Sequence, residues 1–252
     1  MDNMLKDCKT YYGAIDIGSN AVRLLIKCVE EDEQGKVFFS KVLLLRVPLR
    51  LGFDVFAMGK ISETKEKNML RLMKVFHHLM KIYNVEDYRA CATSAMRDAK
   101  NGKDIIKRIK KKTGIRIEII DGQEEAKMIY NNHIECMEDR NGNYMYVDVG
   151  GGSTEINLLS QGELVCSRSY NIGTVRILNN AVKETEWERL KKDMQELAIS
   201  YPGTNIIGSG GNINKLYRLA EKKDKKKQRI TVEVLHKLHE LSLIHISEPT
   251  RH

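Results

Sequence analysis

Apolar and polar positions along the chain predict strands and helices in an order that occurs twice. In the first half, apolar runs predict three strands at residues 11–16, 21–30 and 37–46. A long helix is predicted next, because Ser62 is a candidate N-cap and the apolar residues after it recur at helical spacing. This half ends with strands predicted at 88–93 and 115–120 and helices predicted at 104–112 and 123–136.

The second half repeats this order. Three strands are predicted at 143–149, 153–160 and 163–170, followed by helices within 175–199, a short strand at 205–207 and a helix from Asn212. Two copies of three strands followed by alternating helix and strand predict a duplicated α/β architecture, with mixed sheets and a cleft between the halves. A polar link at 138–142 divides a first lobe, 1–137, from a second lobe, 138–242.

Composition restricts the class of protein. The chain has 252 residues, 42% hydrophobic and 30% charged, as in ordinary globular proteins. Its sequence lacks both a secretory signal pattern and a run of roughly 20 apolar residues that would span a membrane. The five cysteines are scattered without a C-x-x-C pair, which fits a reducing compartment and argues against a zinc site or a disulfide framework. A cytoplasmic protein without a membrane partner is therefore expected.

The net charge of +8 suits an anionic partner. Basic runs at 110–112 and 222–227 concentrate part of this charge. Two interpretations stay open, namely solvated helix ends and loops, or a surface that attracts a polyanion. His77 and His78 are interpreted as ordinary residues of the long helix. The sequence contains no nucleic-acid-binding module and no interleaving of basic and aromatic residues, so no specific nucleic-acid partner is expected.

Two glycine-rich turns carry the candidate chemistry. The segment YVDVGGGSTE at 146–155 places Asp148 at the end of an apolar strand, and GAIDIGSN at 13–20 places Asp16 equivalently. Consecutive glycines leave backbone N–H groups free to converge on a phosphate, and short polar side chains add donors. The predicted phosphate-binding residues of the two turns are Gly18, Ser19, Asn20, Gly150, Gly151, Gly152, Ser153 and Thr154.

An acid beside a phosphate site requires a cation between the two negative charges. Asp16 and Asp148 are therefore predicted to bind Mg²⁺ or its water shell, since Mg²⁺ prefers one or two carboxylates together with phosphate oxygens. The later segment GSGGNINK at 208–215 is not a Walker A loop, because Ile213 and Asn214 stand where that loop needs Gly and Lys.

Four separated segments resemble those of the exopolyphosphatase and guanosine pentaphosphatase phosphatases, a family within the superfamily of actin and the sugar kinases. The segments are IDIGSN at 15–20, ATSAMRDAKN at 92–101, DGQEEAKMIY at 121–130 and YVDVGGGSTEI at 146–156. The resemblance implies an actin-like (ribonuclease H-like) fold of two lobes. It also implies Mg²⁺-dependent hydrolysis of the terminal phosphate of inorganic polyphosphate or of the alarmone guanosine pentaphosphate.

The resemblance also implies roles for individual residues. The catalytic glutamate falls on Glu125, and Arg97 is similar to a phosphate contact of the family. The family's metal and phosphate site falls on Asp148, Gly150, Ser153 and Glu155, and a turn that faces a nucleoside, when one is bound, falls on Gly208, Ser209, Gly210 and Gly211.

Local sequence supports Glu125 over its neighbour as the catalytic glutamate. Asp121 and Glu124 have the spacing of an N-cap and a capping box, which gives Glu124 a structural task at the start of its helix. Glu125 lies about 100° further round the helix and is expected to point into the cleft. The helix N-terminus is expected to keep its carboxylate ionised.

Two other functions stay open. One is a kinase of the same superfamily that uses ATP, because duplicated glycine turns serve a nucleotide equally well. The other is a sensor that binds an alarmone or a nucleotide with little turnover. The oligomeric state also stays open, with a homodimer as one possibility.

The end of the sequence departs from the family. Family members continue beyond the GSGG turn, so the second lobe is expected to be incomplete. Residues 243–252 do not resemble that continuation, and they are expected to be a non-native tail that resembles translated read-through of a sequencing adaptor.

Overall fold

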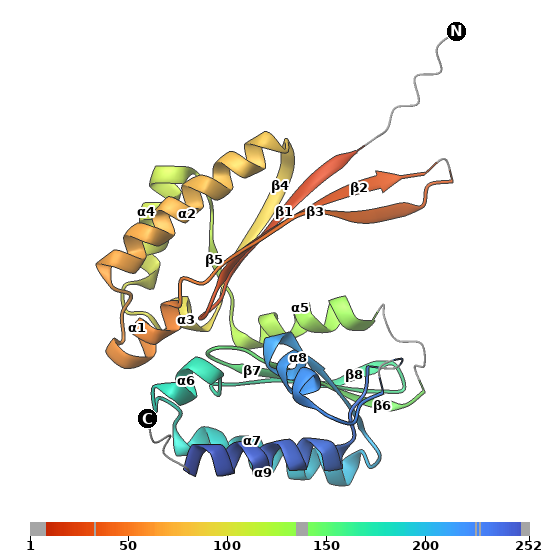
Figure 1. Ribbon diagram of the computed structural model, residues 1–252. Helices are drawn as coiled ribbons and strands as arrows, with labels where there is room; N and C mark the ends of the chain where they lie inside the picture. The colour runs from red at the N-terminus through yellow and green to blue at the C-terminus, as the bar shows by residue number, and fades with distance from the viewer. Residues whose placement is uncertain (1–8, 33, 135–140, 225, 227, 248–252) are drawn as a thin grey trace.

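The structure is a computed structural model that describes residues 9–32, 34–134, 141–224, 226 and 228–247. The described residues form two β-sheets, each with helices beside it (Figure 1). The predicted division at 137/138 and most of the predicted link fall outside the described residues, so that division stays a prediction.

The first sheet has the strand order β3-β2-β1-β4-β5. Strands β1 to β3 form an antiparallel meander, and β4 and β5 add in parallel beside β1. The strands span Thr10–Ile17 (β1), Val22–Glu31 (β2), Val37–Val47 (β3), Val85–Ala92 (β4) and Glu118–Ile119 (β5).

The second sheet repeats this arrangement with the strand order β8-β7-β6-β9. An antiparallel meander is again followed by a parallel strand beside the first one. The strands span Asn143–Val149 (β6), Thr154–Ser160 (β7), Glu163–Tyr170 (β8) and Asn205–Ser209 (β9). The predicted duplicated α/β fold with two mixed sheets is therefore confirmed.

Helices complete both halves. The helices of the first half of the chain span Leu51–Met58 (α1), Glu63–Ile82 (α2), Ser94–Asp98 (α3), Gly102–Thr113 (α4) and Gly122–Ile134 (α5). The helices that follow span Thr174–Leu178 (α6), Glu184–Ser200 (α7), Gly210–Leu219 (α8) and Val232–Ser247 (α9). The N-cap predicted for α2 is confirmed, since the Ser62 hydroxyl accepts a hydrogen bond from the Lys65 N–H.

Several predicted boundaries were wrong. Helices α1, α3 and α9 were not predicted, and α8 begins at Gly210 rather than at Asn212. The strand predicted at 115–120 is reduced to the two residues of β5. Its alternating isoleucines, Ile115 and Ile117, are buried in the core of the first half without joining the ladder of the sheet.

The core of the first half lies between its sheet and the helices α2 and α4. Phe76 and Met73 of α2 are fully buried there, as are Ile105 of α4 and Ile17 and Ile26 of the sheet. In the second half, Ile156, Tyr170 and Ile172 form a smaller cluster, on which the helix α7 packs. The first half therefore has the larger apolar core among the described residues.

Helix α5 packs on the second sheet although it precedes the link between the halves. It lies on the face of β7 and β8 that is turned toward the first sheet, whereas α7 and α9 lie on the opposite face (Figure 1). The buried Asn157 side chain of β7 donates to the Ala126 carbonyl of α5 at 2.9 Å. This contact holds the first turn of α5 between the two halves. None of the helices in the described part of the chain is both long and apolar enough to span a membrane.

Candidate active site

The two glycine turns have the same backbone geometry. In the first turn the Gly18 N–H donates to the Ala21 carbonyl at 3.0 Å, and in the second the Gly150 N–H donates to the Ser153 carbonyl at 2.9 Å. Each turn connects the first two strands of a meander, at the end where Asp16 or Asp148 is found. The structure therefore bears out the equivalence of the two segments that the sequence predicts.

Helix α6 binds every carbonyl of the triple-glycine turn. The Thr174 N–H donates to Gly150 at 3.0 Å, the Val175 N–H donates to Gly151 at 2.7 Å, and the Arg176 Nε–H donates to Gly152 at 2.8 Å. In a trans peptide the N–H of the next residue points opposite to the carbonyl. The N–H groups of residues 151–153 therefore point away from α6, and within the described part of the chain they have no acceptor.

In the first half, the carbonyls of the glycine turn also accept hydrogen bonds from the start of a helix. The Gly52 N–H of α1 donates to the Ser19 carbonyl at 2.8 Å, and the Arg50 N–H donates to the Asn20 carbonyl at 2.9 Å. Arg50 adopts a left-handed conformation, with φ of 52°, directly before α1. Each turn is thus held by the helix that follows its meander, and these two helices contact each other. Helix α1 was not predicted, because eight residues carry too little periodicity to identify a helix.

The two turns touch each other directly. A Cβ atom placed on Gly152 would lie 2.3 Å from Ser94 Oγ and 2.7 Å from Phe56 Cζ, and one placed on Gly151 would lie 3.2 Å from Ser19 Cβ. Ser19 and Ser94 are buried and join their hydroxyls at 2.8 Å. The absence of side chains on the second turn therefore permits a close contact between the halves, in addition to exposing backbone N–H groups.

Arg176 connects the second turn to the first half of the chain. Besides its bond to Gly152, its Nη2 donates to Asp98 Oδ2 of α3 at 2.6 Å. Its guanidinium also stacks 4.1 Å from the ring centroid of Phe56 in α1. Only 10% of the Arg176 side chain is exposed. Nothing in the sequence distinguished this arginine, because its partners come from three distant segments.

The second sheet holds two acids side by side near its glycine turn. Asp148 of β6 and Glu155 of β7 are directly opposite each other in the antiparallel ladder. Like charges in this position are destabilising. Glu155 is 3% exposed and accepts from Ser169 Oγ at 3.0 Å. Burial, and the nearby Asp148 carboxylate, raise the pKa of Glu155, so the pair favours a neutralising cation.

The first sheet neutralises its acid differently. Asp16 is opposite Arg23, the position that Glu155 occupies in the second sheet, and the two side chains form an ion pair. The carboxylate of Asp16 therefore already has a cationic partner. The role of Asp16 as a metal ligand stays a prediction, and the electrostatic need for a cation is greater at Asp148 and Glu155.

Glu125 lies in the first turn of α5 and joins these acids. Its Oε2 atom is buried and has no hydrogen-bond partner among the described residues, and Arg97 Nη1 is 3.9 Å away. Burial first, and then the Glu155 carboxylate, raise the pKa of Glu125, with smaller effects of Asp16 and Asp148 in the same direction. The expectation that the helix N-terminus keeps this carboxylate ionised was therefore wrong, because burial and three neighbouring acids outweigh the helix dipole.

The predicted N-cap of α5 is present, but among the described residues the neighbouring Glu124 carboxylate pairs with Arg89 and forms no capping-box bond. The Glu124 N–H donates to Asp121 Oδ1 at 2.8 Å, which confirms the N-cap. The Glu124 carboxylate accepts from Arg89 Nη2 at 2.7 Å. The Glu124 carboxylate is thus paired on the surface of the first half, whereas the Glu125 side chain is half-buried and its Oε2 atom is fully covered.

Arg97 lies in α3, close to the acids. One of its N–H groups donates to the Ile120 carbonyl at 2.7 Å, and its charge lowers the pKa of both Glu125 and Glu155. This position is compatible with the predicted phosphate contact. Thr154 differs from its prediction, because its buried hydroxyl donates to the Ile172 carbonyl at 2.6 Å and its proton is therefore committed.

The residues present fit a magnesium ion that is held partly by substrate. Within the described residues there is no group of three or more acids, histidines or cysteines with ligand geometry. Mg²⁺ needs only one or two carboxylates when phosphate oxygens and water complete its octahedron. The opposed acids Asp148 and Glu155 supply two such carboxylates.

The predicted nucleoside-side turn lies beside Asp148. Gly208 and Ser209 end β9, and Gly210 begins α8 with a φ of +87°. A Cβ atom on Gly210 would lie 2.8 Å from Asp148 Oδ1. Asn212 Nδ2 donates to the Val149 carbonyl at 2.7 Å and fixes the start of α8 to the end of β6. The turn is therefore close to the candidate metal site, and its role toward a nucleoside stays a prediction.

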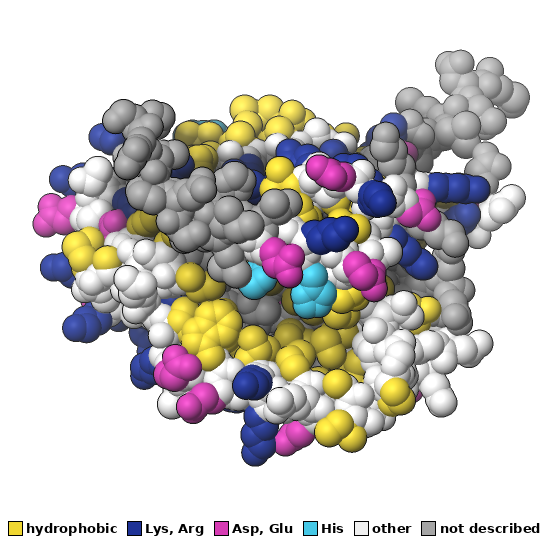
Figure 2. All heavy atoms as spheres, turned by 60° about the horizontal axis from the view of Figure 1, so that its bottom comes forward, with side chains coloured by type: hydrophobic (Ala, Val, Ile, Leu, Met, Phe, Trp, Pro, Cys, Tyr) yellow, Lys and Arg dark blue, Asp and Glu magenta, His cyan; other side chains and the backbone are white. Residues whose placement is uncertain are grey.

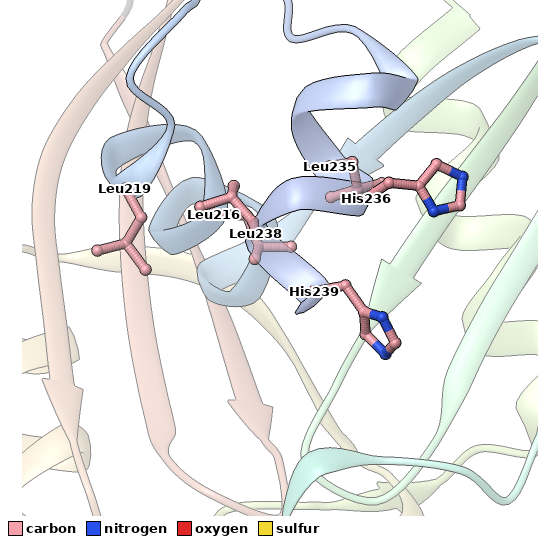
Figure 3. A pocket seen from close by; sticks show the side chains of 6 residues that line it. All are labelled: Leu216, Leu219, Leu235, His236, Leu238 and His239. Atoms are coloured by element: carbon pink, nitrogen blue, oxygen red, sulfur yellow. The ribbon is translucent and has the colours of Figure 1, made fainter. Parts of the chain in front are cut away.

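A cavity of about 500 Å³ lies elsewhere, between α8 and α9. Its lining residues are labelled in Figure 3: Leu216, Leu219, Leu235, His236, Leu238 and His239. In Figure 2, hydrophobic side chains also gather in a hollow on the face turned toward the viewer. Leucines and two histidines supply neither carboxylates nor an array of backbone N–H groups, so this cavity does not fit a phosphate-cleaving site.

The fold and the site together define a two-lobed α/β protein with paired glycine turns beside a group of buried and half-buried acids. The chain belongs to the Ppx/GppA phosphatase family, whose model matches residues 28–251. The family predicted from the four sequence segments is thereby confirmed.

Relatives of several named activities are similar to this chain. A bifunctional 3-dehydroquinate synthase/phosphatase of Fusobacterium nucleatum is 30% identical over 83% of this chain and 34% of its own length. Exopolyphosphatase 1 of Mycobacterium tuberculosis is 24% identical over 79% and 58%. A guanosine-5′-triphosphate,3′-diphosphate pyrophosphatase of Aeromonas hydrophila is 26% identical over 90% and 47%. The chain thus spans about a third to three fifths of the length of these relatives.

Solved structures agree with the fold. A Ppx/GppA family member of Aquifex aeolicus is 27% identical with a TM-score of 0.69, over 92% of this chain and 78% of that one. An exopolyphosphatase of Cytophaga hutchinsonii, at 23% identity, matches with a TM-score of 0.76 over 92% and 79%.

The close contact at Gly152 leads to a first prediction. Gly152→Ala should lower the free energy of unfolding by about 1–3 kcal/mol, because its Cβ overlaps Ser94 and Phe56 and forces the halves apart. Urea denaturation measures this change. Gly211→Ala is the matched control, since a Cβ there meets nothing within 4 Å. Equal stability of Gly152→Ala and the wild type would contradict the close packing.

The contacts of Arg176 lead to a second prediction. Arg176→Gln should destabilise the protein by about 2 kcal/mol, because it breaks a largely buried ion pair. It should also speed hydrogen exchange at the amides of residues 174 and 175, which donate to the carbonyls of the turn. Mass spectrometry measures this change. Arg108→Gln is the control. Arg108 is exposed, so the loss of its ion pair with Glu66 should change stability little. Unchanged exchange in Arg176→Gln would show that α6 holds the turn without this side chain.

Proposed function

We propose that the chain carries the catalytic part of a phosphohydrolase that releases the terminal phosphate of inorganic polyphosphate or of guanosine pentaphosphate. One observation carries the proposal, namely the buried Oε2 of Glu125, which has no hydrogen-bond partner among the described residues, beside a turn whose N–H groups lack acceptors there. A buried carboxylate oxygen without a hydrogen bond is costly. A water molecule and a bound phosphate would satisfy both groups at once.

The terminal phosphate accepts hydrogen bonds from the backbone N–H groups of residues 151–153. Arg97 offsets part of its negative charge, from a position 3.9 Å from Glu125. Because α6 holds the carbonyls of the turn in place, these donors need little rearrangement when substrate binds. Preorganised donors of this kind supply most of the rate in phosphoryl transfer, which needs little covalent help from the protein.

Glu125 orients a water molecule and takes its proton. The water oxygen forms a bond to the terminal phosphorus while the bond to the bridging oxygen breaks. The products are orthophosphate and a chain shortened by one phosphate, which leaves with the electron pair of the broken bond. The proton then passes from Glu125 to solvent, and the site is restored.

Asp148 and Glu155 would hold a magnesium ion next to the phosphate chain. Bound there, the ion supplies positive charge that offsets the phosphate oxygens and the two acids. Its positive charge would also lower the raised pKa of Glu125 toward the ionised state that a base requires. Ser169 fixes the orientation of the Glu155 carboxylate.

Relatives named for polyphosphate and for the guanosine alarmone are both similar to this chain, which supports the substrate class without choosing within it. Release of orthophosphate in the absence of any acceptor alcohol separates this proposal from a kinase. Turnover separates it from a sensor. A cytoplasmic location and a homodimer stay predictions.

Removal of the base should abolish most turnover. Glu125→Gln should reduce kcat by roughly 10²- to 10⁴-fold, the contribution of general-base catalysis, while KM changes little. Phosphate release from polyphosphate and from guanosine pentaphosphate measures both constants. Glu124→Gln is the control, because this neighbouring acid is engaged by Arg89 and should keep nearly full turnover. Wild-type turnover in Glu125→Gln would remove Glu125 from the role.

Removal of the metal should stop the reaction. A chelator should reduce phosphate release to background, and added Mg²⁺ should restore it. Asp148→Asn should raise the Mg²⁺ concentration needed for half-maximal rate by about tenfold or more, since the ion loses one of its few protein carboxylates. Titration of the rate with Mg²⁺ measures this shift. A rate that is independent of chelator and metal would contradict the assigned cation.

A further inference from the structure

A second cavity, which is polar and has a volume of about 330 Å³, lies in the first half of the chain. It is formed by the C-terminal part of α2 and the C-terminal end of α4. Its lining residues are Lys74, His77, His78, Lys111, Lys112, Thr113 and Gly114. Five of these seven residues are basic, and we call the cavity the α2–α4 basic cavity.

The basic residues of α2 share one face of the helix. Lys74, His77, His78 and Lys81 are three or four residues apart, the spacing at which helical side chains are neighbours. The lysines of α4 complement the negative end of their own helix, which is a sufficient reason for lysines at that end. It does not explain why α2 directs a second set of basic groups toward the same cavity.

Acids nearby on the same helices are paired elsewhere. Glu66 of α2 forms an ion pair with Arg108, and Asp104 of α4 pairs with Lys107 at 3.8 Å. These pairs lie toward the N-terminal ends of the helices. Within the described part of the chain, Lys74, Lys111 and Lys112 form no ion pair with an acid, and they are exposed. The lysines of the cavity are therefore not neutralised by ion pairs with described acids.

This crowding of charge acts on the histidines. The His77 and His78 rings lie 5.8 Å apart, edge to face. Burial, then Lys81 and His78, lower the pKa of His77. An anion in the cavity would relieve this repulsion, because it places negative charge among groups that now repel one another.

The cavity is remote from the candidate active site, because it lies at the C-terminal parts of α2 and α4. Strands β1 and β4 run in parallel, and both end near the glycine turn that carries Asp16. Helix α2 precedes β4, and only a short turn separates them, so the C-terminal part of α2 lies near the start of β4. Helix α4 begins just after α3 and runs for 12 residues, which at 1.5 Å per residue is about 18 Å.

We propose that the α2–α4 basic cavity binds internal phosphates of a long inorganic polyphosphate chain whose terminal phosphate lies at the active site. This inference rests on the proposed function and selects polyphosphate as the preferred substrate. Only an extended polyanion reaches both places. The cavity lining contains no Phe, Tyr or Trp on which a base would stack, which favours polyphosphate over a nucleotide or a nucleic acid.

Two double variants with equal loss of charge test the proposal. Lys111→Gln with Lys112→Gln removes two charges from the cavity. Lys41→Gln with Lys67→Gln removes two charges from exposed positions that do not line it. Equilibrium binding of long-chain polyphosphate, tripolyphosphate and a single-stranded DNA oligonucleotide is measured in chelator, so that hydrolysis does not consume the ligand. Phosphate release is measured separately with Mg²⁺.

The cavity variant should bind long-chain polyphosphate about three- to tenfold more weakly, with a salt slope smaller by about 1 to 2. Its affinity for tripolyphosphate and its kcat should equal those of the wild type. The His77 and His78 ring protons should shift in the NMR spectrum when long-chain polyphosphate is added. The control variant should lose affinity for neither ligand.

Three results would overturn the proposal: equal losses in the two double variants, equal losses for long and short chains, or tighter binding of the oligonucleotide than of polyphosphate at the cavity. Absence of phosphate release from every substrate would contradict the proposed function alone. In that case the binding measurements still decide whether the cavity holds polyphosphate.

Discussion

The carbonyl groups of the triple-glycine turn are the constraint on which the rest of the site depends. Helix α6 donates hydrogen bonds to all three, from the backbone N–H groups of residues 174–176 and from the Arg176 side chain. Because the carbonyls are held on one side, the following N–H groups point to the other side. Arg176 also connects the turn to the first half of the chain. Its ion pair with Asp98 and its stacking on Phe56 fix the position of the turn relative to that half. The glycines permit this approach, and the helix makes it rigid.

The acids around the turn explain why a cation belongs there. The duplicated sheets place Arg23 opposite Asp16 in one half and Glu155 opposite Asp148 in the other. The first pair neutralises itself, whereas the second concentrates negative charge close to Glu125. Burial first, and then this charge, raise the pKa of both glutamates. Gene duplication would give both halves the same turn, and the difference at this one ladder position makes the second half the one that needs a metal. Arg97 supplies part of the compensation within the protein.

The sequence predicted those parts that local patterns encode. Alternating apolar runs gave both meanders, the spacing of Asp121 and Glu124 gave the N-cap of α5, and the glycine segments gave both turns. Contacts between distant segments were not predictable in this way. The partners of Arg176 lie 24 residues from it in one case and 78 in another, and the raised pKa of Glu125 results from burial that only the packing of α5 against the second sheet creates. Helices α1 and α3, of eight and five residues, are too short for periodicity to reveal them.

The most direct test is a crystal structure of Glu125→Gln with Mg²⁺ and tripolyphosphate. The terminal phosphate should lie within hydrogen-bond distance of the N–H groups of residues 151–153. Mg²⁺ should contact the carboxylates of Asp148 and Glu155 directly or through water, and residue 125 should face the phosphorus opposite the bridging oxygen. A phosphate bound elsewhere, with those N–H groups turned away from it or bonded to protein, would contradict the claim that α6 sets the turn for phosphate.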